Sequence, residues 1–356
     1  MAGKTYNWVH VRRVAERVPC AFCFFIGGRG CGKTYGTLTD HRDDFLEGKA
    51  GKMLYTRLTN KQIDACATTT DNPYNKINKD KNWNIHFESA GAKSDAYDII
   101  DDTDGEPMVI GEGRSLASFH DLRGVDFDDV TEWYFDEFIP AENVRKTPEI
   151  KRAGFLFSQA YETVNRNREL EGRPPVKVIF TANAFDLNSS ILSYFGLIDI
   201  IQTMQRKGQR RYTDKAHDIY IELVDSADIS EAKKQTALYR ALGHNQKLID
   251  IALENKFDDP AIRMTRRDVK LIEYNPVFTF DGRVTLYQHK ASGVWHFARR
   301  DDKNAKERYT KDMRGRLLAK WGTAVRMVVF EQRATFDSAD TYYNVDIIFD
   351  KSIKKL

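Results

Sequence analysis

The sequence is poor in cysteine and contains no long apolar stretch. Its 356 residues include only four cysteines, too few for a disulfide scaffold, so we expect a reducing compartment. No apolar run approaches the roughly 18 residues that span a membrane. The first residues, MAGKTYNWVHVRR, lack the apolar core of a signal peptide. We therefore expect a protein that is neither secreted nor inserted in a membrane.

Cys20 and Cys23 have the spacing of half a zinc site. The sequence has no second pair of this kind and no nearby pair of histidines, and Cys23 stands inside an apolar run. Because cysteine is among the residues most often buried in protein cores, we interpret both as core residues.

The composition is ample for a folded core. Hydrophobic residues make up 41%, charged residues 30% and aromatic residues 12%, which excludes a disordered or collagen-like chain. The length predicts two domains. The net charge of +3 is uneven, because residues 1–200 hold 25 basic and 30 acidic side chains, whereas residues 201–356 hold 30 and 22. The C-terminal part is the better candidate for contact with nucleic acid, and a solvated basic surface is the alternative.

Short apolar runs alternate with helix-compatible segments along the first 200 residues. Four of these runs are typical of buried strands: 21–26, 52–57, 130–135 and 176–181. Helices are expected over 34–46 and 155–170, so the pattern predicts an α/β domain with a parallel sheet. Residues 60–129 are interpreted as a helix and a β-rich insertion on this domain.

The rest of the chain predicts a linker and a smaller domain. Residues 203–249 are polar and favour helix, with basic clusters at Arg206, Lys207, Arg210 and Arg211. Residues 272–298 are typical of a β-meander, and residues 304–319 suit a basic helix. We therefore expect an α/β domain over 1–202, a helical linker or lid over 203–249, and an α+β domain over 250–356.

Residues 27–34 match the phosphate-binding loop, GxxxxGK followed by Ser or Thr. The pattern follows an apolar strand and opens a helix, which is the context that such a loop requires. Backbone N–H groups would wrap the phosphates, Lys33 would reach the β- and γ-phosphates, and the Thr34 hydroxyl would hold Mg²⁺. The candidate nucleotide contacts are Gly27, Gly28, Arg29, Gly30, Cys31, Gly32, Lys33 and Thr34.

Two of the predicted strands end in polar side chains that suit hydrolysis. Asp136 and Glu137 follow the run at 130–135; the first can hold Mg²⁺ and the second can polarise a water for attack on the γ-phosphate. Asn183 closes the run at 176–181, where it could sense the γ-phosphate or simply form a turn. Arg166 and Arg168 lie at the end of the helix predicted over 155–170, between these two strands. One of them could stabilise charge at a neighbouring subunit's site, or both could complement the helix dipole.

The segments FFIGGRGCGKTYG, EWYFDEFIP, NRNRE and VIFTANAF, in that order, resemble the DNA-packaging ATPases of small tailed phages of the φ29 kind. The resemblance covers roughly residues 20–200. It implies a P-loop fold of the additional-strand, catalytic-glutamate class. It assigns ATP to residues 27–34, Mg²⁺ to Thr34 and Asp136, the general base to Glu137 and coupling to Asn183.

The same resemblance extends to partners and further residues. It makes Arg166 the trans-acting arginine and marks Arg57 as a basic position with an open role in phosphate, subunit or DNA contact. It implies a homomeric ring, commonly pentameric, that drives double-stranded DNA into a preformed capsid at its portal, in the host cytoplasm, with a structural RNA in some members. It also implies that the C-terminal domain is a vestigial RNase H-like nuclease fold without nuclease activity.

Two other functions fit the same residues. A terminase with an active C-terminal nuclease would also cut DNA, which an Mg²⁺- or Mn²⁺-dependent cleavage assay detects. A nucleotide-gated assembly protein would bind ATP and hydrolyse it slowly, and the Asp136-Glu137 pair argues against it. The base of the nucleotide could stack on Tyr6 or Trp8, which could equally be packing residues.

Overall fold

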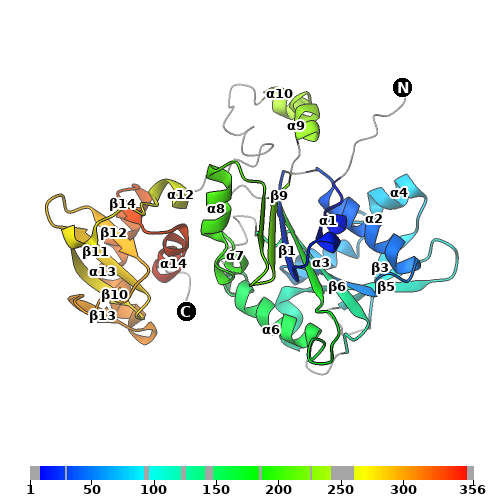
Figure 1. The fold of residues 1–356 in the computed structure, drawn as a ribbon, viewed down its shortest axis with the longest axis horizontal. Helices are drawn as coiled ribbons and strands as arrows, with labels where there is room; N and C mark the ends of the chain where they lie inside the picture. Colours follow the sequence, from blue (N-terminus) through cyan, green and yellow to red (C-terminus); the bar gives the residue numbers. More distant parts are fainter. Residues whose placement is uncertain are drawn as a thin grey trace. The chain divides into compact units, whose positions relative to one another are not determined.

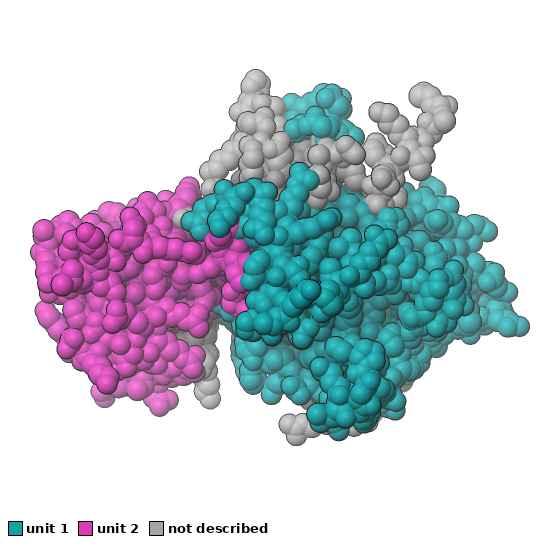
Figure 2. All heavy atoms as spheres, viewed as in Figure 1, with its two compact units in different colours: residues 1–185, 189–194, 204–257 teal, residues 186–188, 195–203, 258–356 magenta. Residues whose placement is uncertain are grey.

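The computed structural model of the chain describes residues 9–28, 30–91, 96–121, 126–140, 147–183, 187–224, 227–241 and 260–350. The chain separates into two compact units, shown in different colours in Figure 2. Unit 1 comprises residues 1–185, 189–194 and 204–257, and unit 2 comprises residues 186–188, 195–203 and 258–356. Within the described ranges, no helix is both long and apolar enough to cross a membrane.

Unit 1 is built on a nine-stranded sheet (Figure 1). In spatial order its strands are β3 (Ile85–Ser89), β4 (Ala96–Asp101), β5 (Met108–Ser115), β2 (Lys52–Arg57), β6 (Val130–Asp136), β7 (Lys177–Ala182), β1 (Phe22–Ile26), β9 (Ile219–Leu223) and β8 (Arg211–Asp214). The strands from β5 to β9 in this order are parallel, and β3, β4 and β8 pair antiparallel with their neighbours. The predicted α/β architecture with a large parallel sheet is confirmed.

Helices lie on both faces of this sheet. The helical elements of unit 1 are α1 (Val11–Arg17), α2 (Lys33–Leu46), α3 (Asn60–Cys66), α4 (Asn75–Lys81), η1 (Leu116–Asp121), α5 (Pro148–Lys151), α6 (Ala153–Asn165), α7 (Ser190–Tyr194), α9 (Ala227–Lys234) and α10 (Ala237–Ala241). Figure 1 shows α1 and α2 on one side of the sheet and α6 and α7 on the other.

The apolar strands are explained by burial on both faces. Along β1, Cys23 and Phe25 belong to the core cluster that includes Leu38 of α2. Phe22 faces the other way, and its ring centroid lies 6.3 Å from that of Phe157 in α6. A strand covered on both sides has no reason to alternate apolar with polar residues. Cys23 is fully buried in this core, as the sequence predicts.

The helical linker predicted over 203–249 is wrong for residues 211–223. These residues form β8 and β9, and β9 pairs in parallel with β1 from Phe22↔Ile219 to Ile26↔Leu223. Strand β8 is a short edge strand with alternating exposed residues, so its sequence is polar. Strand β9 is a short apolar run, IYIEL, which suits a buried strand but stands alone within a polar, helix-favouring stretch. The sheet of unit 1 therefore extends beyond the expected boundary at residue 202, and the helices α9 and α10 follow it.

Unit 2 contains a five-stranded sheet in the order β13 (Glu307–Tyr309), β10 (Tyr274–Phe280), β11 (Val284–His289), β12 (Trp295–Ala298) and β14 (Ala334–Phe336). The predicted meander is confirmed as β10–β11–β12, whereas β13 and β14 pair in parallel with β10 and β12. Its helical elements are most of α8 (Ile198–Arg206), α12 (Pro260–Met264), η4 (Leu271–Glu273), η5 (Lys311–Met313), α13 (Arg314–Phe330) and α14 (Ala339–Phe349).

The basic helix predicted over 304–319 begins later than expected. Helix α13 starts at Arg314, because residues 307–309 form β13 against β10. The helix packs its buried Leu317 into a core that also contains Phe278, Phe297 and Phe336. The RNase H-like interpretation of this unit stays a prediction.

Candidate active site

The carboxyl ends of β1, β2, β6 and β7 lie at one edge of the sheet because these strands are parallel neighbours. This edge is where ligands bind in open parallel sheets. It collects the loop at 27–34, Arg57, the pair Asp136-Glu137 and Asn183 from four separate parts of the sequence.

The loop between β1 and α2 has a tight backbone that only glycine adopts without strain. Gly30 and Gly32 have φ values of 74° and 89°, and Gly32 is the N-cap of α2. A Cβ atom on Gly27 would lie 2.8 Å from Cβ of Val224. The turn therefore aims the positive N-terminus of α2 into the loop, which suits a phosphate group.

The predicted contacts Arg29, Tyr6 and Trp8 lie outside the described residues. Cys31 is fully buried, and its thiol donates to the Gly28 carbonyl at 3.3 Å. In the structure, the Cys31 side chain packs beneath the loop, so only its backbone is placed to meet a ligand.

Lys33 and Asn183 meet inside the loop although they lie 150 positions apart in the sequence. The Lys33 ammonium donates to Asn183 Oδ1 at 2.9 Å and to the carbonyls of Gly27 and Gly28 at 3.1 and 2.9 Å. The lysine is only 6% exposed. A buried cation held by neutral oxygens is well placed to exchange one of them for a phosphate oxygen.

Asp136 accepts hydrogen bonds from a ring of hydroxyl groups. The Thr34 hydroxyl lies 3.3 Å from both carboxylate oxygens, and the Thr181 hydroxyl donates to Oδ1 at 2.8 Å. Tyr134 donates to Oδ1 at 3.1 Å, and Tyr55 donates to Oδ2 at 3.2 Å. The two predicted metal ligands, Thr34 and Asp136, thus form a pair of hard oxygen donors of the kind that Mg²⁺ prefers.

The hydroxyls of Tyr55, Tyr134 and Thr181 were not among the predicted site residues. Burial raises the pKa of both tyrosines well above the usual range, so each phenol keeps its proton and donates it. The sequence could have indicated Tyr134, because it stands two positions before Asp136 on the same strand and therefore lies on the same face of the sheet. Tyr55 lies directly opposite Tyr134 in the register of β2 and β6.

Glu137 and Arg57 form an ion pair beside Asp136. The Arg57 Nη1 atom lies 2.7 Å from Glu137 Oε2, and Nη2 lies 3.6 Å from Asp136 Oδ2. Arg57 Nε donates to the Tyr55 hydroxyl at 3.0 Å. Glu137 has a φ of 54°, a left-handed conformation that costs a residue with a Cβ about 1–2 kcal/mol. Such strained residues are concentrated at functional sites.

Arg166 lies at the opposite edge of the sheet from these residues. It ends α6, and its guanidinium lies 3.6 Å from Asp126, which precedes β6. The nearby Arg168 donates to the carbonyl of Val130, the first residue of β6. Since Asp136 ends the same strand, the two edges are roughly 20 Å apart at 3.3 Å per residue. Arg166 therefore does not contact the site of its own chain.

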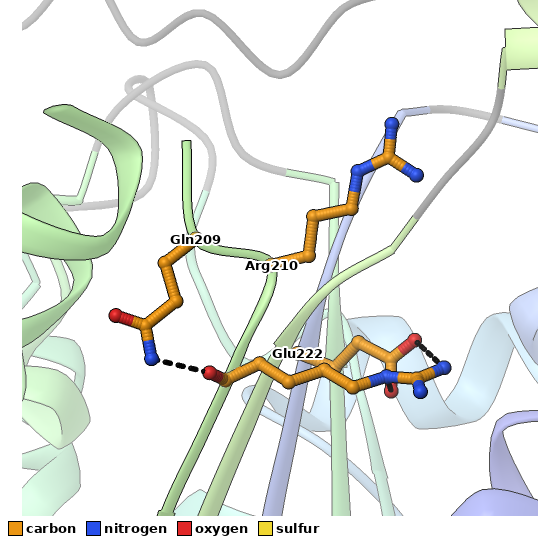
Figure 3. Close-up of a pocket in the computed structure, with 4 residues that line it drawn as sticks. Gln209, Arg210 and Glu222 are labelled. Carbon is orange, nitrogen blue, oxygen red and sulfur yellow. Dashed lines mark hydrogen bonds and ion pairs between the residues drawn. The ribbon is translucent and has the colours of Figure 1, made fainter. Parts of the chain in front are cut away.

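A hollow of about 580 Å³ lies where β8 begins, lined by Gln209, Arg210, Arg211 and Glu222 (Figure 3). The Arg211 guanidinium pairs with Glu222 at 3.2 and 3.3 Å, and the Arg210 side chain points away from this pair. Glu222 lies near the carboxyl end of β9, which is parallel to β1. One of the basic clusters seen in the sequence is therefore at the same edge as the loop.

Comparisons with known proteins agree with this geometry. The family model described as podovirus DNA encapsidation protein (Gp16) matches residues 15–314. A search of curated proteins found no significant match. Among solved structures, the Phi-28 gp11 DNA packaging motor has a TM-score of 0.63 and 14% identity, covering 98% of this chain and 99% of that chain. The bacteriophage Phi-29 viral genome packaging motor assembly has a TM-score of 0.60 and 16% identity, covering 98% and 100%. At these identities the likeness shows a shared fold.

Proposed function

This chain belongs to the podovirus DNA encapsidation protein family and is a DNA-packaging ATPase, and from that premise we propose that it is a ring motor driving double-stranded DNA into a preformed capsid. The family match confirms the resemblance that the motifs predict. The proposal rests above all on the meeting of Lys33, Asn183, Thr34, Asp136 and Glu137 at one edge of the sheet.

The loop and its neighbours account for nucleotide binding. The backbone N–H groups of residues 27–34 and the Lys33 ammonium would hold the phosphates of ATP. Thr34 and Asp136 would hold Mg²⁺, whose oxygen preference their hydroxyl and carboxylate satisfy. The ion would neutralise charge on the phosphates. The hydroxyls around Asp136 fix the direction of its carboxylate before any ligand arrives.

Glu137 is the group best placed to activate water. Its carboxylate would accept a proton as the water oxygen attacks the γ-phosphorus and the bond to the ADP oxygen breaks. Arg57 holds this carboxylate at 2.7 Å and so acts as a positioning residue. Asn183 already contacts the Lys33 ammonium. Through this contact it would couple the presence of the γ-phosphate to β7.

The position of Arg166, away from the loop of its own chain, supports action on another subunit. It lies at the sheet edge away from its own loop, where its side chain is 46% exposed beside Asp126. An arginine that stabilises charge at a neighbour's γ-phosphate makes hydrolysis depend on a closed ring. A homomeric ring, pentameric by the resemblance, is therefore part of the proposal.

Subunit mixing tests this shared site. We expect hydrolysis by wild-type protein, measured with linear double-stranded DNA, to fall faster than the wild-type fraction when Arg166→Ala subunits are added. Arg173→Ala is the matched control, because Arg173 pairs with Asp128 at the same edge. A fall in strict proportion would remove Arg166 as a trans-acting residue. Hydrolysis that is also indifferent to DNA would favour a nucleotide-gated assembly protein.

The remaining parts of the proposal concern partners. The motor would act at the portal of the assembling capsid in the host cytoplasm, with a structural RNA as a possible further component. The basic C-terminal part would contact DNA or portal through charge, since a motor must hold the phosphate backbone of any sequence. We propose a vestigial RNase H-like fold for unit 2, and an Mg²⁺- or Mn²⁺-dependent cleavage assay separates it from an active terminase nuclease.

The hydroxyl groups around Asp136 predict that removing one of them raises the Mg²⁺ concentration needed for hydrolysis. In Tyr134→Phe, Asp136 loses one hydrogen-bond donor and Thr34 loses a polar neighbour at 3.3 Å. We expect the Mg²⁺ concentration for half-maximal hydrolysis to rise about 10-fold, the size typical for removing a group that orients a metal ligand. Tyr97→Phe is the matched control, because the hydroxyl of Tyr97 on β4 donates to Asp64 on α3, away from Asp136. An unchanged Mg²⁺ dependence in Tyr134→Phe would show that this hydroxyl does not help Asp136 to hold Mg²⁺.

A further inference from the structure

A lysine outside the predicted site lies against the phosphate-binding loop. A Cβ atom on Gly30 would be 2.6 Å from Nζ of Lys233 and 3.1 Å from its Cε. Gly30 is in the middle of the loop, and Lys233 is in the last turn of α9. The ammonium group therefore occupies the space beside the loop that any other side chain at position 30 would need.

The sheet explains how α9 reaches the loop. Strand β9 runs parallel to β1, and just beyond it the Val224 amide donates to the Ile26 carbonyl at 2.8 Å. Val224 also packs so close to Gly27 that a Cβ there would collide with it. The chain thus leaves β9 at the start of the phosphate loop, and α9 follows a few residues later.

Among the described residues, two lysines at the loop come from different elements. The Lys33 ammonium lies inside the loop against the Gly27 and Gly28 carbonyls, whereas Lys233 touches the loop at Gly30. A lysine is a compact charge with three donors on a flexible stem, so a small movement brings it to a phosphate oxygen. Its neighbour Lys234 is engaged differently, in an ion pair with Glu231 at 2.7 Å.

We propose that Lys233 is a second phosphate-contacting lysine of the nucleotide site, supplied by α9. Its ligand class is a nucleoside di- or triphosphate, because the loop that it touches holds the β-phosphate through backbone N–H groups. Helix α9 then forms a wall of the site, and its position depends on the bound nucleotide. The inference rests on the proposed function, in that residues 27–34 bind ATP.

The test compares binding of ADP, carrying a fluorescent ribose label, to the full chain and five variants. We expect Lys233→Ala and Lys233→Gln to weaken binding about 10-fold, the loss of one charge-assisted contact, and Lys233→Arg to restore most of it. The affinity of Lys233→Gln should also depend less on salt concentration, since one charge is lost. Lys234→Ala is the matched control and should bind as wild type. Hydrogen exchange of α9 should slow when ADP is added.

The possible outcomes distinguish the role of Lys233 from the proposed nucleotide site at residues 27–34. If Lys33→Ala loses ADP binding while Lys233→Ala and Lys233→Gln bind as wild type, the role of Lys233 is overturned and the nucleotide site stands. If Lys33→Ala binds ADP normally, the proposed nucleotide site itself fails. Equal weakening by Lys234→Ala would mean that only the general charge of α9 matters, which also overturns the specific role of Lys233.

Discussion

A Glu137→Gln variant is expected to bind ATP as tightly as the wild type and to hydrolyse it about 10²- to 10⁴-fold more slowly, the range for loss of a general base. Glutamine has the shape of glutamate but accepts no proton from water. The loop contacts of Lys33 do not involve residue 137, so binding should survive. Steady-state hydrolysis and nucleotide binding measured on the same preparation check both halves of this prediction.

A matched control is available in the same sheet. Glu112 on β5 also pairs with an arginine, since its Oε2 atom lies 2.9 Å from Nη2 of Arg114. Glu112→Gln therefore removes a similar charge from a similar pair away from the loop, and it should hydrolyse ATP normally. A Glu137→Gln protein that assembles, hydrolyses ATP and packages DNA at the wild-type rate would contradict the motor mechanism.

Replacing Arg12 should cause a large loss in the free energy of unfolding. The guanidinium is buried between α1, α2 and β6, where Nε donates to Glu132 at 2.7 Å and Nη1 pairs with Asp44. In Arg12→Met, Glu132 would keep a buried charge without its partner, whereas Asp44 would retain Arg13 at 2.5 Å. Breaking a buried pair in this way costs about 3–5 kcal/mol, measurable as the free energy of unfolding in urea.

The pH dependence of this loss has a defined sign. Burial raises the pKa of Glu132, and Arg12 opposes that shift. Without Arg12 the folded-state pKa rises further above the ordinary value of 4.5, so the folded state binds the proton more tightly than the unfolded chain. Stability of Arg12→Met should therefore fall as pH rises above about 4.5 and up through the new pKa.

A double variant tests the cause. Arg12→Met with Glu132→Gln removes the buried charge together with its partner, so we expect it to recover at least half of the lost stability and to lose the added pH dependence. Equal stability of the single and double variants at pH 8 would show that packing of the Arg12 side chain, and not the charge of Glu132, sets the loss.

The residues that meet at the candidate site could be predicted from the sequence, because they stand in short local patterns. The loop at 27–34 is contiguous, and Asp136, Glu137 and Asn183 directly follow apolar strands. A run of buried residues marks a strand, and parallel strands bring their carboxyl ends to one edge. The predicted strand at 52–57 coincides with β2 for the same reason.

The side chains around these groups could not be predicted from the sequence. The contact of Tyr55 and Tyr134 with Asp136 depends on the register of β2 against β6, and the pairing of Arg57 with Glu137 depends on these strands being neighbours. Strand order and register arise from contacts between distant segments, which no local pattern records. For the same reason the place of β9 beside β1 was not predicted, although its residues are apolar, and the position of Lys233 beside Gly30 follows from where β9 joins the sheet.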